Sequence, residues 1–275
     1  MGDDLQGKYK EIYDSSINQK ENFWKNIAEN IFWYKKPSKI LNSSNPPFYK
    51  WYEDGVTNTC YNAIDFHIDN GRGEKLAIIY DSPITGSKKT LTYNQLKEKV
   101  SLFAGALKNQ GIKKGDRVII YMPMIPEAVI AMLACGRIGA VHSVVFGGFA
   151  ANELSSRIDD SKAKIIVSAS CGYEPGRVVE YKPLLNKALK LSKHKPNKCI
   201  IFQRNKNEAV LDSKIDISWD DALKNAKPAS CVEMNANDYA YILYTSGTTG
   251  LPKGIVRDIG GHIVALKWTM KNIYN

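Results

Sequence analysis

Residues 117–146 read RVIIYMPMIPEAVIAMLACGRIGAVHSVVF, a stretch with two short apolar runs and a helical segment between them. The runs Arg117–Met122 and Val141–Phe146 have the length and composition of buried strands. Pro126 stands where a helix can begin, and Glu127–Cys135 continues the helical pattern. A strand, a helix and a second strand at this spacing predict a βαβ unit whose two strands are parallel.

The same alternation extends from residue 76 to residue 244. The other predicted strands are Leu76–Tyr80, Lys164–Ala169, Lys198–Gln203 and Tyr239–Tyr244. Another predicted helix begins at a Thr92–Gln95 capping box and ends at Gly111. Three more are predicted, at Asn152–Asp160, at Leu184–Lys193 and from Trp219 onward. We therefore predict an α/β fold with a doubly wound, mainly parallel sheet flanked by helices.

The first 50 residues have a different character. Phe23, Ile27 and Ile31 recur at spacings of four, which predicts an amphipathic helix packing on a larger body. Residues 35–49 contain several prolines and serines, which is typical of a surface linker. The predicted organisation is a helical and linker segment over residues 1–50 and an incomplete large domain over residues 51–275.

Composition and charge exclude several classes of protein. The chain has 275 residues, of which 44% are hydrophobic and 24% charged, as in ordinary globular domains. The 38 Lys and Arg against 28 Asp and Glu give a net charge of +10. Only seven of the basic residues are Arg and the Lys are spread along the chain, which argues against a nucleic-acid binder. The excess can still attract polyanionic small molecules.

The spacing of the cysteines and the length of the apolar runs exclude further classes of protein. The five cysteines are Cys60, Cys135, Cys171, Cys199 and Cys231. They include no Cys-x-x-Cys pair, which argues against a disulfide framework and a zinc site, so no metal ligand is assigned. No apolar run approaches the roughly 20 residues of a membrane span, and the N-terminus has no signal-like segment. We expect a cytoplasmic protein without a membrane partner.

The strongest local signal is the sequence YTSGTTGLPKG at residues 244–254, directly after a predicted strand. Its glycines permit a tight turn with exposed N–H groups, its hydroxyls add donors, and a lysine follows, all of which suit phosphate oxygens. The Gly-x-x-x-x-Gly-Lys-Ser/Thr spacing of a P-loop is absent. The predicted phosphate ligands are Thr245, Ser246, Gly247, Thr248, Thr249, Gly250 and Lys253.

This loop resembles the phosphate-binding signature of the adenylate-forming superfamily. The resemblance to short-chain acyl-CoA synthetases runs from about residue 50 to the last residue. It includes WYEDG at 51–55, CYNA at 60–63, GDRV at 115–118, YMPM at 121–124, MLAC at 132–135, RIGAVHS at 137–143 and FGGF at 146–149. The segments EPGR at 174–177, YKPL at 181–184, HKP at 194–196 and KGIVR at 253–257 resemble the propionyl-CoA synthetase branch, with the acetyl-CoA synthetase branch as nearest relative.

The resemblance implies part of the large N-terminal domain of an adenylate-forming enzyme. Such an enzyme joins a short carboxylate to ATP, releases pyrophosphate with Mg²⁺ as partner, and then transfers the acyl group from AMP to CoA. The implied CoA contacts are Gly147, Gly148, Glu174, Pro175, Gly176 and Arg177. Glu174 stands where the acetyl branch tends to carry Arg. Because a carboxylate cannot bind phosphate, the CoA contact expected at this position would be made through the backbone or with the adenine.

Family members are more than twice this length. The acyl pocket, the hinge and the C-terminal domain with the lysine that assists adenylation are expected to be missing here, so no catalytic residue is assigned. We expect that the chain does not turn over by itself, and the choice of propionate over acetate rests on branch resemblance. A non-catalytic ATP- or CoA-binding module stays an alternative, and a nucleic-acid binder is the interpretation that charge alone suggests.

Overall fold

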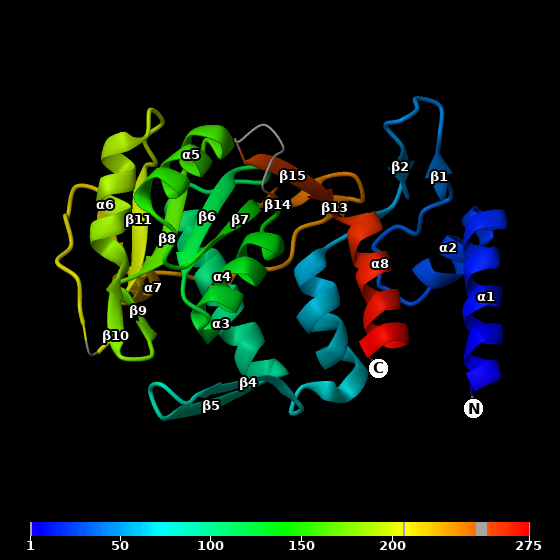
Figure 1. The fold of residues 1–275 in the computed structure, drawn as a ribbon, viewed down its shortest axis with the longest axis horizontal. Helices are drawn as coiled ribbons and strands as arrows, with labels where there is room; N and C mark the ends of the chain where they lie inside the picture. Colours follow the sequence, from blue (N-terminus) through cyan, green and yellow to red (C-terminus); the bar gives the residue numbers. More distant parts are fainter. Residues whose placement is uncertain (1, 206, 246–251, 275) are drawn as a thin grey trace. The chain divides into compact units, whose positions relative to one another are not determined.

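A seven-stranded sheet forms the centre of the larger part of the molecule, with the strand order β12-β11-β8-β6-β7-β14-β15 (Figure 1). The computed structural model describes residues 2–205, 207–245 and 252–274. The strands are β6 (Arg117–Met122), β7 (Val141–Phe146), β8 (Ile165–Ala169), β11 (Lys198–Phe202), β12 (Asp216–Ser218), β14 (Tyr239–Thr245) and β15 (Lys253–Asp258). The described pairings from β12 to β14 are all parallel.

Helices cover both faces of this sheet, as the strand–helix alternation predicts. One face carries α3 (Tyr93–Asn109), α4 (Pro126–Arg137) and α7 (Trp219–Lys224), and the other carries α5 (Ala151–Ser161) and α6 (Tyr181–Leu191). Strand β6 shows why: Val118 and Ile120 pack with the first set of helices, while Ile119 and Tyr121 pack with the second. Burying such an aliphatic side chain stabilises the fold by about 1.5–3 kcal/mol. The predicted doubly wound α/β fold is confirmed.

Local signals set where two of the helices begin. The Thr92 hydroxyl accepts a hydrogen bond from the Gln95 N–H at 3.3 Å, and the Gln95 side chain accepts one from the Thr92 N–H at 3.0 Å. This reciprocal pair is the predicted capping box of α3. Pro126 is the first residue of α4, where its missing N–H costs nothing.

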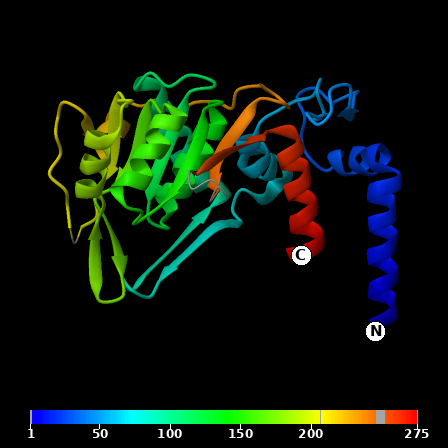
Figure 2. The same ribbon diagram turned by 45° about the horizontal axis from the view of Figure 1, so that its top comes forward.

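The predicted buried strand Leu76–Tyr80 is wrong in its burial. Strand β4 (Leu76–Ser82) pairs with β5 (Ser87–Thr92) as a separate antiparallel hairpin, which projects from the sheet in Figure 2. Ile79 is 73% exposed. An apolar run shows that a strand can form, but it does not show which elements will cover its two faces, and here the strand stays outside the sheet.

The structure divides into two compact units. The larger comprises Asn58–Val232 and Tyr239–Arg257, and the smaller comprises Met1–Thr57, Glu233–Asp238 and Asp258–Asn275. The larger unit also contains the hairpin β9 (Cys171–Glu174) and β10 (Arg177–Glu180) and the short helices η1 (Tyr61–Asp65) and η2 (Ile68–Arg72). The predicted boundary at residue 50 stays a prediction.

The smaller unit is built on helices and aromatic side chains. Its elements are α1 (Gly2–Asn18), α2 (Lys20–Ala28), α8 (Gly260–Thr269), η3 (Met270–Tyr274) and the short strands β1 (Leu41–Asn42), β2 (Lys50–Trp51), β3 (Val56–Thr57) and β13 (Met234–Asn235). The predicted helix included Ile31, but α2 ends at Ala28. Ile31 lies beyond this end, although it shares one core with Ala28 and Trp33.

Candidate functional site

The two glycine-containing loops singled out in the sequence follow neighbouring strands. Strands β7 and β14 are parallel partners, with Tyr241 opposite His142. Four residues further along each strand, Thr245 and Phe146 end their strands at the same edge of the sheet. Carboxyl ends of parallel strands are where open α/β sheets bind ligands. The predicted phosphate loop and the predicted CoA turn therefore start from the same edge.

Only the two ends of the phosphate loop belong to the described residues. Thr245 is the last residue of β14 and Lys253 the first of β15, and both are exposed. Ser246, Gly247, Thr248, Thr249 and Gly250 lie outside the described residues. Lys253 forms no ion pair within the described part of the chain, so its charge is available to an anion.

Two side chains of α5, Asp160 and Arg157, contact Tyr244 at the start of this loop. Sequence reasoning assigned a role to neither of them. The Tyr244 hydroxyl donates a hydrogen bond to Asp160 Oδ2 at 2.6 Å. Burial, together with the Asp160 charge, raises the pKa of Tyr244 above its usual value, so the phenol stays a neutral donor. The Arg157 guanidinium lies 5.3 Å from the centre of the Tyr244 ring and 5.2 Å from that of Phe149. Arg157 thus touches residues beside both loops.

The turn after β7 needs glycine at two positions. Gly148 has φ +97°, which side chains rarely tolerate. A Cβ on Gly147 would lie 2.2 Å from the Tyr181 hydroxyl and 2.9 Å from the Met122 carbonyl oxygen. Tyr181 is buried and stacks on Tyr121 at a ring distance of 5.0 Å, so it has little room to retreat. Gly147 is therefore required by packing against Tyr181, whereas at Gly148 a Cβ would meet only the Glu174 carboxylate, at 4.0 Å.

The β9–β10 hairpin brings the other predicted CoA residues to the same turn. The Glu174 carboxylate lies 4.0 Å from the position of a Cβ on Gly148. Arg177 donates to Glu174 through Nε at 2.7 Å and through Nη2 at 2.6 Å. Pro175 and Gly176 form the exposed turn between them. Arg177 is the residue predicted to bind a phosphate, and its charge is partly neutralised by Glu174. Glu174 is also the position at which the acetyl branch tends to carry Arg.

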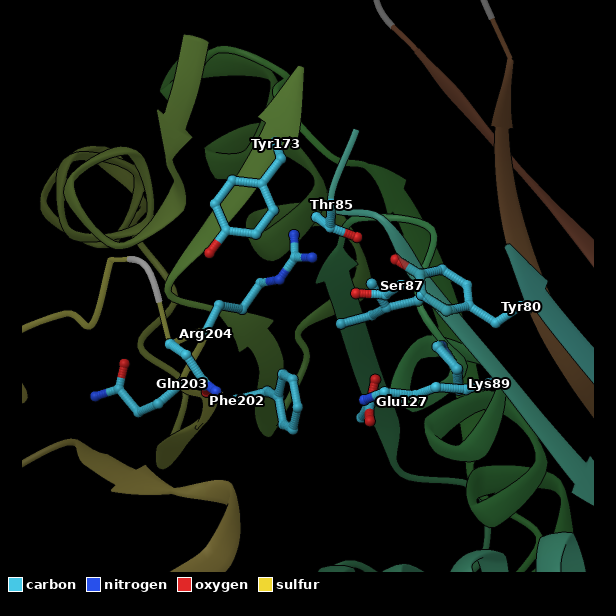
Figure 3. Close-up of a pocket in the computed structure, with 12 residues that line it drawn as sticks. Tyr80, Thr85, Ser87, Lys89, Glu127, Tyr173, Phe202, Gln203 and Arg204 are labelled. Carbon is cyan, nitrogen blue, oxygen red and sulfur yellow. The ribbon is translucent and has the colours of Figure 1, made fainter. Parts of the chain in front are cut away.

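A separate cavity opens on the other face of β9. Successive strand residues point to opposite faces, so Tyr173 faces away from the Glu174 side. The cavity of about 220 Å³ lies between the β4–β5 hairpin, the start of α4 and the end of β11 (Figure 3). The Arg204 guanidinium lies 4.0 Å over the Tyr173 ring, and Arg204, Lys89 and Glu127 bring charge to the rim. No motif in the sequence pointed to this cavity.

If this turn binds CoA, as the resemblance implies, replacing Gly147 with alanine should raise the KM for CoA about tenfold, a loss of about 1.4 kcal/mol. The methyl group would meet Tyr181 and Met122 and push the turn out of place. Initial rates with the enzyme as its own cell makes it, in the CoA-independent and the CoA-dependent half-reactions, measure the effect. Gly86→Ala controls for general destabilisation, because Gly86 has a positive φ, which Gly147 lacks, while a Cβ there meets nothing. An equal loss in both half-reactions would contradict a CoA role for this turn.

A doubly wound sheet with a glycine turn at the carboxyl edge of its strands is an architecture in which many α/β proteins bind nucleotides. The sequence model of the AMP-binding enzymes matches residues 67–274, and that of the acetyl-coenzyme A synthetase N-terminus matches residues 9–63. The chain therefore belongs to the AMP-binding enzyme family. The predicted class, the AMP-forming acid–thiol ligases, is confirmed at the level of the family, as is the resemblance to the N-terminal portion of short-chain acyl-CoA synthetases.

Individual relatives agree with this assignment. The chain is 53% identical over 269 residues to acyl-CoA synthetase short-chain family member 3, mitochondrial, of Rattus norvegicus, covering 98% of this chain and 39% of that protein. It is 42% identical to propionate–CoA ligase of Escherichia coli, covering 97% and 42%. The structure of acetoacetyl-CoA synthetase from Streptomyces lividans superposes with a TM-score of 0.84 at 22% identity, covering 93% and 39%, and supports the fold.

The chain spans about two fifths of the length of the curated relatives that it matches. Within the described residues, no helix has both the length and the apolar character that a membrane crossing requires.

Proposed function

We propose that the chain is the N-terminal portion of an enzyme that activates a short-chain carboxylate with ATP and transfers the acyl group to CoA. The carboxylate is propionate or acetate, the intermediate is acyl-AMP, and the products are pyrophosphate, AMP and acyl-CoA. Propionate is the preferred candidate, because a relative at 42% identity is named a propionate–CoA ligase.

The observation that supports this proposal most directly is the edge shared by Thr245 and the Gly147 turn. In-line displacement at the α-phosphate needs no nucleophile from the protein, only donors and positive charge where pyrophosphate departs. Lys253 and the residues from Thr245 to Gly250 would supply them. In the turn of Gly147 and Gly148, the open position at Gly148 would let the CoA nucleotide approach the backbone.

Mg²⁺ enters the proposal as the partner of the ATP phosphates. Of the carboxylates near this edge, Asp160 accepts the Tyr244 hydroxyl and Glu174 pairs with Arg177, so both already have partners. The hydroxyl of Thr245 is exposed at the strand end and suits a magnesium-bound water or a phosphate oxygen. The metal would thus be carried mainly by ATP.

Two measurements test the function. The intact mass of the protein from its own cell is compared with 30.8 kDa, the mass of this chain. The same protein is then assayed for ATP–pyrophosphate exchange that depends on added propionate or acetate, with butyrate and no acid as controls. We expect a larger mass and propionate-dependent exchange, while the 275-residue chain by itself should show none.

Other results would favour the alternatives. Mg²⁺-dependent ATP binding without exchange in the native protein would indicate a non-catalytic binder. Affinity for DNA or RNA that falls steeply with salt would indicate a nucleic-acid binder. The cytoplasmic location stays a prediction, and the mitochondrial name of the rat relative makes fractionation of the source cell the direct check.

A further inference from the structure

Two cysteines that are far apart in the sequence lie side by side in the larger unit. The sulfur atoms of Cys60 and Cys231 and a carboxylate oxygen of Asp65 all lie within 4.8 Å of one another. Cys60 is fully buried just before η1, and Cys231 is half-buried on an irregular surface segment. The phosphate loop and the CoA turn contain neither residue, and the proposed reaction uses neither.

Backbone contacts hold the two cysteines in this position. Arg137 Nε donates to the Ala229 carbonyl at 2.6 Å, and the Val232 N–H donates to the Arg137 carbonyl at 2.9 Å. Asn58 Nδ2 donates to the Val232 carbonyl at 2.9 Å. Hydrogen bonds thus tie the segment on both sides of Cys231, and it lies against the residues that carry Cys60.

The surrounding charges favour a thiolate. Arg137 Nη1 lies 3.5 Å from Cys60 Sγ, while the Cys231 thiol donates to Asp65 Oδ2 at 3.7 Å and its sulfur lies within 4.8 Å of Cys60 Sγ. The neighbouring Cys231 thiol, and then the Arg137 charge, lower the pKa of the Cys60 thiol, while burial and the Asp65 charge act in the opposite direction. A peroxide-reactive cysteine needs a stabilised thiolate and access to solvent. Cys60 has the cation and the neighbouring thiol but is fully buried, so peroxide has to reach the pair from the side of half-buried Cys231.

The same charges argue against a metal centre at these three groups. Arg137 donates to Asp65 Oδ2 at 2.7 Å, and Lys97 lies 3.0 Å from Asp65 Oδ1. Both carboxylate oxygens are therefore engaged by cations, and a zinc ion would have to displace them while facing two positive charges. The dithiol, in contrast, needs no rearrangement of this ion pair.

We propose that Cys60 and Cys231 form a modification site at which hydrogen peroxide generates a reversible disulfide. Peroxide oxidises the Cys60 thiolate to a sulfenic acid and leaves as hydroxide, which takes up a proton to become water. The Cys231 sulfur then attacks the sulfenic sulfur, the S–S bond forms and a second water leaves. In sum, two thiols and one peroxide give one disulfide and two waters, the sulfurs losing the two electrons that the peroxide gains.

Two other cysteines serve as internal references. Cys135 and Cys199 are fully buried, and burial raises the pKa of each thiol to about 12. Neither has the low pKa or a thiol neighbour of the kind that Cys60 has. They should stay reduced at peroxide concentrations that convert the pair.

The test uses the protein as its own cell makes it, reduced and then treated with a small excess of hydrogen peroxide. After unfolding in an alkylating agent, peptide mapping by mass spectrometry should find the peptides of Cys60 and Cys231 linked, with a loss of two hydrogen atoms. Dithiothreitol should restore both alkylated peptides. Because the link closes a long loop of the chain, the Tm should rise by roughly 5 °C.

The variant Cys231→Ser sharpens the test, because Cys231 is half-buried and serine nearly preserves its shape. In this variant we expect no link, and a sulfenic acid on Cys60 that dimedone, added together with the denaturant, traps when the chain unfolds. Full alkylation of Cys60 and Cys231 after peroxide would overturn the proposal, as would a link to any other cysteine. One zinc ion bound per chain that blocks oxidation would also overturn it and would make the cluster a metal site.

Discussion

Replacing Lys182 with methionine is expected to lower the free energy of unfolding by about 3–5 kcal/mol, because it leaves a buried carboxylate without its counter-ion. The side chains of Lys182 in α6 and Asp216 in β12 are 3% and 0% exposed. The ammonium lies 2.8 Å from each carboxylate oxygen and donates to the Asn186 side chain at 2.5 Å. After the replacement, Asp216 keeps the hydrogen bond from the Asp212 N–H at 2.7 Å.

Urea unfolding followed by circular dichroism measures this loss as a shift of the midpoint. The double variant Lys182→Met with Asp216→Asn should recover more than half of it, because the amide can be buried without a charge. Lys224→Met is the matched control, since Lys224 pairs with Asp221 at the surface, where an ion pair contributes little. A Lys182→Met midpoint equal to that of the control would contradict the argument.

The parts of the fold that sequence predicted are those with local causes. The bounds of β6 and β7 agree with the predicted ones to the residue, because glycine, proline and charge punctuate both apolar runs. The start of α3 at Thr92 follows from a hydrogen-bond exchange within four residues. The bounds of these elements depend on residues within one turn or one strand, so the local sequence is sufficient to predict them.

The parts that sequence did not predict depend on contacts between distant residues. Asp160 lies 84 positions from Tyr244, yet the two share a hydrogen bond at the start of the phosphate loop. Cys60 and Cys231 belong to no spacing motif, and only the folded chain brings them together. The predicted burial of strand β4 was wrong for the same reason, because the burial of a strand depends on which distant elements pack against it. Long-range packing leaves no periodic signal.

Replacing Lys253 with methionine should lower the rate of acyl-dependent ATP–pyrophosphate exchange about 10²–10³-fold, the usual cost of removing one preorganised electrostatic contact. Lys253 is exposed at the start of β15 and makes no ion pair among the described residues. With ATP bound at this edge of the sheet, the Lys253 ammonium would stabilise the complex most when negative charge builds up on the departing pyrophosphate. We therefore expect kcat to fall more than ATP affinity.

The matched control for Lys253 is Lys187→Met, an exposed lysine of α6 on the same unit, which should leave exchange unchanged. Lys253→Arg keeps the charge with a different shape and should retain part of the activity. Binding of ATP to Lys253→Met, measured by calorimetry, separates affinity from chemistry. If ATP affinity falls as much as kcat, the lysine binds the ground state and the transition state equally. If neither changes, Lys253 takes no part in releasing pyrophosphate, and the phosphate loop must act through its backbone and hydroxyl donors.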